Sequence, residues 1–164
     1  MKRHHVKVKN FMQLLGRLPK PLAEKVLEEL PKRFEVEVCK LEGGFEVYLA
    51  EGKPLLLVDG DGRVMPTLMS KALNMLPKVT VDRGAIPHIC RGADVMRPGI
   101  VKVEGEFGEG EVVAILDDEH RKPLALGLSL FPSSEVERLK KGKMVKTIHY
   151  VGDRIWKLYR NFKA

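Results

Sequence analysis

Two apolar runs in the second half of the chain limit its possible folds more than any other feature. Residues 112–116 (VVAIL) and 123–130 (PLALGLSL) are nearly continuous apolar segments. Because they are short and apolar at successive positions, they are typical of strands that are covered on both faces or wrapped into a barrel. The polar sequence DDEHR at residues 117–121 lies between them and predicts a hairpin tip.

Further short patterns surround these two runs. We expect six strands in this half, over residues 79–81, 100–103, 112–116, 123–130, 143–150 and 155–162. One helical turn is expected after Gly84, and a short helix from Ser133 or Ser134 to Leu139. Six short strands with two short helices predict a small closed barrel.

The first half mixes both kinds of pattern. We expect helices over residues 11–15, from Pro21 to Pro31 and from Pro66 to Leu76, with strands over 34–38, 45–49 and 54–58. The fold class is therefore α+β. Pro77-Lys78 is the expected boundary, because a helix stops there and a strand begins, so the predicted domains are residues 1–77 and 78–164. The connection is short, and we expect the two domains to pack against each other.

Charge and cysteine content narrow the class of protein. The formal net charge is +7 and the pI is about 9.4, which favours an anionic partner. Residues 1–78 carry 14 basic and 10 acidic residues and residues 79–164 carry 15 and 12, so the basic excess is expected in both halves. No apolar run reaches the roughly 18 residues of a membrane helix. Cys39 and Cys90 lack zinc-type spacing, and we expect a cytoplasmic protein.

Residues 79–100 carry the strongest functional signal. A short strand pattern leads into an Asp-Arg-Gly corner, one apolar helical turn and a second glycine. Glycines let a polymer backbone approach closely, and arginine can donate two hydrogen bonds to one phosphate. The alternative is that the arginines are solvated or form ion pairs with Asp82 and Asp94, and that His88 is an ordinary surface residue. We interpret the segment as a nucleic-acid clasp whose candidate residues are Arg83, Gly84, His88, Arg91, Gly92, Arg97 and Gly99.

The last two expected strands add a second group of candidates. Lys157 follows Trp156 directly, so in a strand the two side chains point to opposite faces. If Trp156 belongs to the core, Lys157 is free to contact phosphate. The Lys140-Lys141-x-Lys143 sequence is interpreted as a helix C-terminus rather than as an RNA contact. The second group of candidates is Lys146, His149, Lys157 and Arg160.

Catalytic and metal-binding patterns are not found. Asp59-Gly60-Asp61-Gly62 has the start of a calcium loop, but Arg63 stands where a further ligand is expected. Asp117 to His120 holds acids and a histidine at an exposed tip, where no cleft can shift their pKa values. There is no glycine loop followed by Lys-Ser/Thr for nucleotide phosphates. We therefore expect no enzyme, no cofactor and no metal site.

Several short motifs resemble a known family. Gly84-Ala85, residues 92–96 (GADVM) and residues 98–100 (PGI) resemble the signature of the PUA domain, an RNA-binding module named after pseudouridine synthases and archaeosine transglycosylases. Residues 148–156 (IHYVGDRIW) and Pro66-Thr67-Leu68 resemble the malignant T-cell-amplified-sequence and ligatin family, in an archaeal form. The resemblance implies a pre-PUA domain at residues 1–77 and a PUA domain at residues 78–164.

The resemblance also implies a function. PUA domains bind structured RNA, often double-stranded stems and the tRNA acceptor end. The eukaryotic relatives act on the small ribosomal subunit together with density-regulated protein. We therefore expect a non-catalytic, translation-associated factor whose partners are tRNA or rRNA, the small subunit or a translation factor. The alternative is an RNA-binding accessory subunit of a pseudouridine-type RNA-modification machinery.

Overall fold

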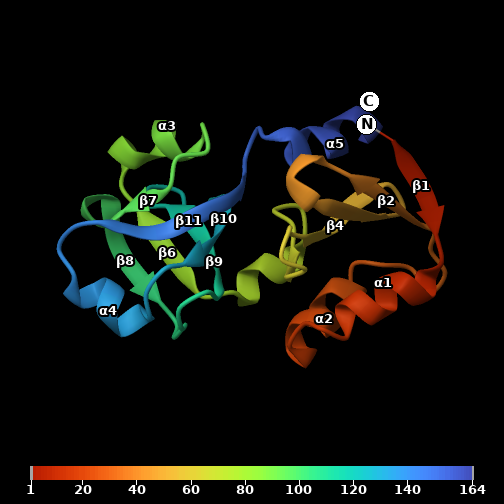
Figure 1. The fold of residues 1–164 in the computed structure, drawn as a ribbon, viewed down its shortest axis with the longest axis horizontal. Coiled ribbons are helices and arrows are strands. Elements are labelled where there is room, and N and C mark those ends of the chain that lie inside the picture. Colours follow the sequence, from red (N-terminus) through yellow and green to blue (C-terminus); the bar gives the residue numbers. More distant parts are fainter. Residues whose placement is uncertain (1, 164) are drawn as a thin grey trace. The chain divides into compact units, whose positions relative to one another are not determined.

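The computed structural model describes residues 2–163, and the side chains of residues 2–159. The chain forms two compact units, one of residues 1–75 with 154–164 and one of residues 76–153, which we call unit 1 and unit 2. Each contains one β-sheet (Figure 1).

Unit 1 is a five-stranded antiparallel sheet with helices. Its strands lie in the order β1-β2-β3-β4-β5, so β1 and β5 are the edges. The strands are β1 (Arg3–Val6), β2 (Val36–Lys40), β3 (Glu46–Ala50), β4 (Lys53–Val58) and β5 (Val64–Pro66). The helices are α1 (Val8–Leu15), α2 (Lys20–Leu27), α5 (Arg154–Lys163) and the 3-10 helices η1 (Glu42–Gly44) and η2 (Lys71–Met75).

The core of unit 1 lies on both sides of β4. Residues 54–58 of this strand are all buried, which requires cover on both faces of the sheet. Figure 1 shows α5 on one side of β4, with α1 and α2 on the other, and α5 contacts β4. From α1, Phe11 is fully buried and meets the ring of Phe34 edge-on, with centroids 5.6 Å apart.

Unit 2 is a curled six-stranded sheet. Its strand order is β7-β11-β10-β9-β6-β8, and β6 pairs with β9 in parallel while the other pairs are antiparallel. The strands are β6 (Lys78–Val81), β7 (Val95–Met96), β8 (Ile100–Glu104), β9 (Val112–Asp117), β10 (Pro123–Ser129) and β11 (Lys143–Tyr150). The helices are η3 (Arg83–Ala85), α3 (Ile86–Ile89), η4 (Arg97–Gly99) and α4 (Ser133–Arg138).

The expected α+β class and the six-stranded, barrel-like sheet with few helices are confirmed. Residues 113–117 and 125–127 are buried, as the two apolar runs predict. From these runs, Val113, Ile115 and Ala125 join one hydrophobic core with residues of other elements, which include Val79, Ile89, Val95 and Val145.

The strand expected over residues 155–162 is wrong, because this segment is helix α5. Ile155 and Leu158 are buried while Lys157 between them is exposed, which is the spacing of a helix face rather than of a strand. The sixth strand of the sheet is instead the two-residue β7. The helix expected to begin at Pro66 starts later, as the 3-10 helix η2 at Lys71, because β5 extends to Pro66.

Candidate nucleic-acid interface

The corner after β6 is built by one side chain and one glycine. The Asp82 carboxylate accepts a hydrogen bond from the backbone N–H of Ala85 at 3.0 Å, which caps η3. At the other end of α3, the N–H of Gly92 donates to the carbonyl of Ile89 at 2.9 Å, with a φ of 90° at Gly92. A side chain at this position would be strained, and its Cβ would lie 3.1 Å from the Tyr150 ring.

A second close approach holds η4 beside η3. The N–H of Asp82 donates to the carbonyl of Gly99 at 2.9 Å. A Cβ on Gly99 would lie 3.2 Å from that of Ala85, tighter than ordinary van der Waals contact. Glycine at this position therefore lets the two short helices approach each other.

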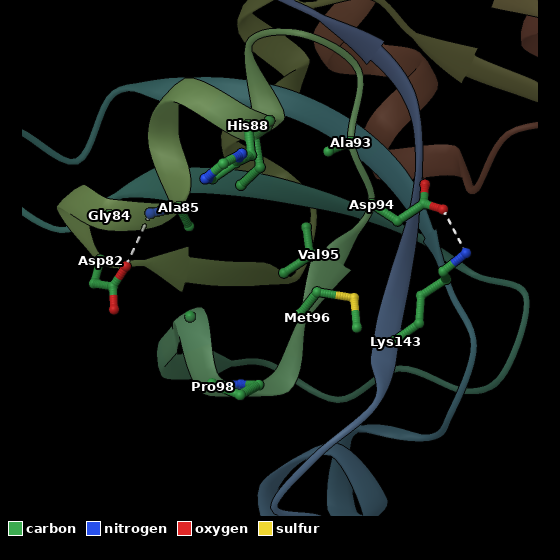
Figure 2. A pocket seen from close by; sticks show the side chains of 12 residues that line it. Asp82, Gly84, Ala85, His88, Ala93, Asp94, Val95, Met96, Pro98 and Lys143 are labelled. Carbon is green, nitrogen blue, oxygen red and sulfur yellow. Dashed lines mark hydrogen bonds and ion pairs between the residues drawn. The ribbon is translucent and has the colours of Figure 1, made fainter.

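Between these elements lies a pocket of about 610 Å³. Figure 2 shows it bounded by α3, β7, η4 and the start of β11. Its wall is mostly apolar and includes Met96, whose exposed fraction is 49%. The ionisable groups in the wall are two carboxylates, one imidazole and one ammonium. The lining residues are Asp82, Gly84, Ala85, His88, Ile89, Ala93, Asp94, Val95, Met96, Pro98, Gly99 and Lys143.

Asp94 fixes one side of the pocket. One of its carboxylate oxygens accepts from the N–H of Thr147 at 2.9 Å, and the other lies 2.9 Å from the ammonium of Lys143. The Thr147 hydroxyl donates to the carbonyl of Ala93. These two hydrogen bonds and one ion pair join β11 to the segment before β7, and they hold this wall of the pocket in place.

The structure gathers some of the predicted residues at this pocket. Gly84, His88 and Gly99 line it, and Arg91 and Gly92 belong to the loop that joins α3 to β7. His88 and Arg91 are exposed. Arg83 is exposed but forms an ion pair with Glu119 at 3.0 Å, beside a separate small pocket. Arg83 therefore has an ion-pair partner, which is Glu119 and not Asp82 or Asp94.

Arg97 and His149 both have hydrogen-bond partners within the protein. The Arg97 guanidinium donates to the carbonyls of Leu139 at 2.8 Å and Ile100 at 3.1 Å. His149 is fully buried, with Nδ1 2.9 Å from a carboxylate oxygen of Asp153. The expectation that His149 contacts RNA is therefore wrong, and Arg97 is satisfied by the protein's own backbone.

The remaining candidates are separated between the units. Lys146 is exposed on β11 of unit 2. Lys157 is exposed and lies on α5, which belongs to unit 1, whereas the pocket belongs to unit 2. The side chain of Arg160 lies outside the described part of the chain. Trp156, expected in the core, is half-buried.

Of the twelve residues that line the pocket, the sequence-based candidates include only Gly84, His88 and Gly99, and the residues not among the candidates include Met96 and Lys143. Their positions are paired across β7 and β11 in an antiparallel register. Only this long-range pairing places them at one pocket, and no local pattern in the sequence predicts it. Lys143 had instead been interpreted as part of a helix C-terminus, whereas α4 ends at Arg138.

The described residues offer little sign of other chemistry. Burial raises the pKa values of the Cys39 and Cys90 thiols, which makes both less reactive. Within residues 2–163, no group of three or more His, Cys, Asp or Glu is placed to hold a metal ion. None of the helices described is long and apolar enough to cross a bilayer.

Comparison with known proteins identifies the family. The PUA domain family matches residues 77–151. An uncharacterized protein of Methanocaldococcus jannaschii is 40% identical over 143 residues, covering 86% of this chain and 85% of the relative. Translation machinery-associated protein 20 of Schizosaccharomyces pombe is 31% identical, covering 84% and 80%. Malignant T-cell-amplified sequence 1 of Rattus norvegicus is 27% identical, covering 91% of each chain.

Comparison with solved structures leads to the same family. A hypothetical protein of Pyrococcus horikoshii superimposes with a TM-score of 0.79 at 29% identity, over 96% of this chain and 99% of that one. A PUA domain protein of Aeropyrum pernix, solved as a tartrate complex, gives 0.74 at 29% identity, over 97% and 91%. The chain therefore belongs to the PUA-domain family of translation machinery-associated protein 20 and malignant T-cell-amplified sequence 1.

Proposed function

We propose that this protein is a non-catalytic RNA-binding factor of the translation machinery, which holds structured RNA such as the tRNA acceptor end at the pocket of unit 2. The observation that carries the proposal is the position of this pocket, which lies within the segment that matches the PUA domain. The names of the relatives support a role in translation. On this proposal the protein works in the cytoplasm, with the small ribosomal subunit or a translation factor as partner.

The chemistry of the pocket fits an unpaired nucleotide better than a bare phosphate. Two carboxylates, those of Asp82 and Asp94, line it and disfavour an anion inside. The exposed Met96 and the neighbouring Pro98 offer apolar surface on which the face of a base can lie. Arg91 and Lys146 are exposed outside the pocket, and we assign to them the phosphates of the same strand.

The test uses Met96→Glu, with Val101→Glu as the matched control. Both side chains are apolar and 49% exposed in unit 2, but only Met96 lines the pocket. Fluorescence anisotropy measures binding of a tRNA with an intact single-stranded 3′ end and of the same tRNA trimmed to a blunt end. We expect Met96→Glu to weaken binding of the intact tRNA at least about tenfold, the size of one lost base contact, and Val101→Glu to change it little.

Two outcomes would contradict the proposal. If the intact and trimmed tRNAs bind equally well, the single-stranded acceptor end is not the ligand. If the two variants have equal effects on binding, the pocket is not the binding site. Affinity purification from cells distinguishes the two biological roles. Recovery of small ribosomal subunits supports the translation role, whereas recovery of an RNA-modification enzyme with its RNA supports the accessory-subunit alternative.

A further inference from the structure

The net charge of the molecule resides in unit 1. Residues 76–153, which form unit 2, contain 12 basic and 12 acidic residues and are therefore neutral. The residues of unit 1 contain 17 basic and 10 acidic residues, which accounts for the whole formal charge of +7. The even division expected between the two halves of the sequence does not hold for the folded units, because α5 brings its four basic residues to unit 1.

Within unit 1 the charge is concentrated at the start of the chain. Residues 1–20 contain six Lys and Arg and no Asp or Glu, which leaves 23 basic and 22 acidic residues in the other 144 positions. This segment forms β1, α1 and the first residue of α2. The short stretch from Lys2 to Lys9 also includes His4 and His5.

Most of these side chains are exposed and unneutralised. Lys2, His4, His5, Lys7 and Lys9 are all exposed, and we call these five residues the β1–α1 patch. Within the part of the chain that the structure describes, none of its three lysines forms an ion pair. Arg3, between them, does pair with Glu37 at 3.4 Å and is left out of the patch.

The patch borders a broad depression on the surface. Residues His5 to Lys7 with Lys9 and Asn10 line an open hollow of about 650 Å³ where β1 turns into α1. Lysine ammonium groups can each rotate three donors toward an anion, which suits phosphates repeated along a backbone. Among Phe, Tyr and Trp, the first 20 residues contain only Phe11, which is fully buried, so the exposed rings of this segment are the small imidazoles of His4 and His5. Cationic groups therefore outnumber stacking surfaces in the patch, which favours contact with the RNA backbone over contact with its bases.

We infer that the β1–α1 patch is a second RNA contact, which binds the phosphate backbone of the RNA without reading its bases. The identity of the anion rests on the proposed function, whereas the patch itself rests on the charge and exposure described above. Two contacts on one chain raise the effective concentration of RNA at each, so a weak backbone contact increases the total affinity. An acidic protein is the competing occupant, since Val8 and Met12 on α1 are partly exposed beside the patch.

The test compares Lys2→Glu/Lys7→Glu/Lys9→Glu with Lys122→Glu/Lys140→Glu/Lys141→Glu. Both triple variants change the charge by the same amount, and the three control lysines are exposed on unit 2 away from the pocket lining. Anisotropy with a tRNA and with an unrelated RNA hairpin is measured from low to high salt, and circular dichroism verifies folding.

We expect the patch variant to bind both RNAs at least about tenfold more weakly than the control variant. The slope of log affinity against log salt should fall by about two to three, because each phosphate contact contributes about 0.7–0.9 to it. Equal binding by the two triple variants would overturn the inference. So would competition by poly-glutamate that is as strong, charge for charge, as competition by RNA, because the patch would then not prefer an RNA backbone to an acidic protein.

The outcome separates this inference from the proposed function. If Met96→Glu weakens binding and the patch variant does not, the pocket stands and the patch fails. If the patch variant weakens binding and Met96→Glu does not, the patch stands and the pocket fails. A wild-type protein that binds neither RNA at low salt overturns both.

Discussion

The two units of this protein differ in net charge and in how many of their cations form ion pairs. Unit 2 is neutral, and several of its cations are paired internally, such as Lys143 with Asp94 and Arg121 with Glu104. Unit 1 has a net charge of +7, with an exposed lysine patch at its start. Yet the PUA domain match lies in unit 2. The pocket therefore belongs to unit 2, whereas the excess of positive charge belongs to unit 1.

If the pocket of unit 2 binds RNA, as we propose, then net charge alone is a poor guide to the position of a recognition site. Electrostatic attraction acts over about 10 Å at ordinary ionic strength and depends little on shape. A pocket, by contrast, recognises a ligand only when the two are in contact, and its shape depends on a fixed backbone. Substitutions at the buried contacts and the tight corner of unit 2 should therefore affect stability, in contrast to substitutions of the exposed charges of unit 1.

The largest effect is expected for His149→Ala. The imidazole is fully buried and contacts Asp153, whose carboxylate also accepts from the N–H of Tyr150 at 2.9 Å. Its removal leaves a cavity and an incompletely satisfied carboxylate, at a cost of about 2–4 kcal/mol. Urea denaturation measures the loss, and hydrogen exchange of β10 and β11 locates it.

His88→Ala is the control for this change. His88 is exposed at the pocket, so its loss should leave the free energy of unfolding within about 0.5 kcal/mol of the wild-type value. If His149→Ala changes the free energy of unfolding as little as His88→Ala does, the buried contact between His149 and Asp153 does not stabilise unit 2.

The second prediction concerns the left-handed corner at Gly92. Gly92→Ala should cost about 1–3 kcal/mol, because the φ of 90° is strained for alanine and its Cβ meets the Tyr150 ring. Gly110 has a φ of 81° with nothing within 4 Å of an added Cβ. The difference between Gly92→Ala and Gly110→Ala in urea denaturation thus isolates the Tyr150 contact. Equal losses would mean that strain alone is responsible.

The third prediction separates two arginines that the sequence presents alike. Arg97→Ala should destabilise the protein by about 1–2 kcal/mol, because two backbone carbonyls lose their donor. Arg91→Ala should leave stability unchanged and weaken RNA binding several-fold, because Arg91 is exposed beside the pocket. Thermal unfolding and anisotropy on both variants measure the two effects. An exchange of the two phenotypes would reverse the assignment of these residues.

The sequence predicts those parts of the fold that are set by local pattern. The strands β9 and β10 follow from their apolar runs, and the Gly92 corner follows from a glycine next to a short helical turn. These features depend on neighbours in the chain, and local composition therefore suffices. The α5 helix was missed because its apolar residues were interpreted with the period of a strand.

Contacts between distant segments explain what could not be predicted at the pocket. Met96 and Lys143 meet only because β7 pairs with β11. The burial of His149 depends likewise on tertiary packing, although its spacing of four residues from Asp153 was a signal for a paired histidine. The neutrality of unit 2 emerges only after α5 is assigned to unit 1.

The smallest effect concerns an acid that stabilises unit 2 locally. The sequence predicts exposed acids with unshifted pKa values at the β9–β10 hairpin tip, and for Asp117 this expectation is wrong. Its carboxylate is buried and accepts hydrogen bonds from the N–H groups of His120 and Lys122. The His120 N–H, as the largest contribution, lowers the pKa of Asp117 below its ordinary value. A carboxyl whose pKa is lowered on folding stabilises the protein above its unfolded pKa, about 3.9 for Asp, and this stabilisation is lost as the pH falls through the folded value.

Asp117→Asn should therefore be less stable than the wild type at pH 7, by no more than about 1 kcal/mol, because the amide oxygen can still accept one hydrogen bond. The difference should shrink as the pH falls below about 4, where the Asp117 carboxyl of the unfolded chain takes up its proton, and it should continue to shrink until the folded protein is protonated as well. Urea denaturation from pH 7 to pH 3 measures both, with the exposed neighbour Asp118→Asn as control. A difference that grows toward low pH would have the wrong sign, and the hairpin tip would then owe its shape to the backbone turn rather than to this carboxylate.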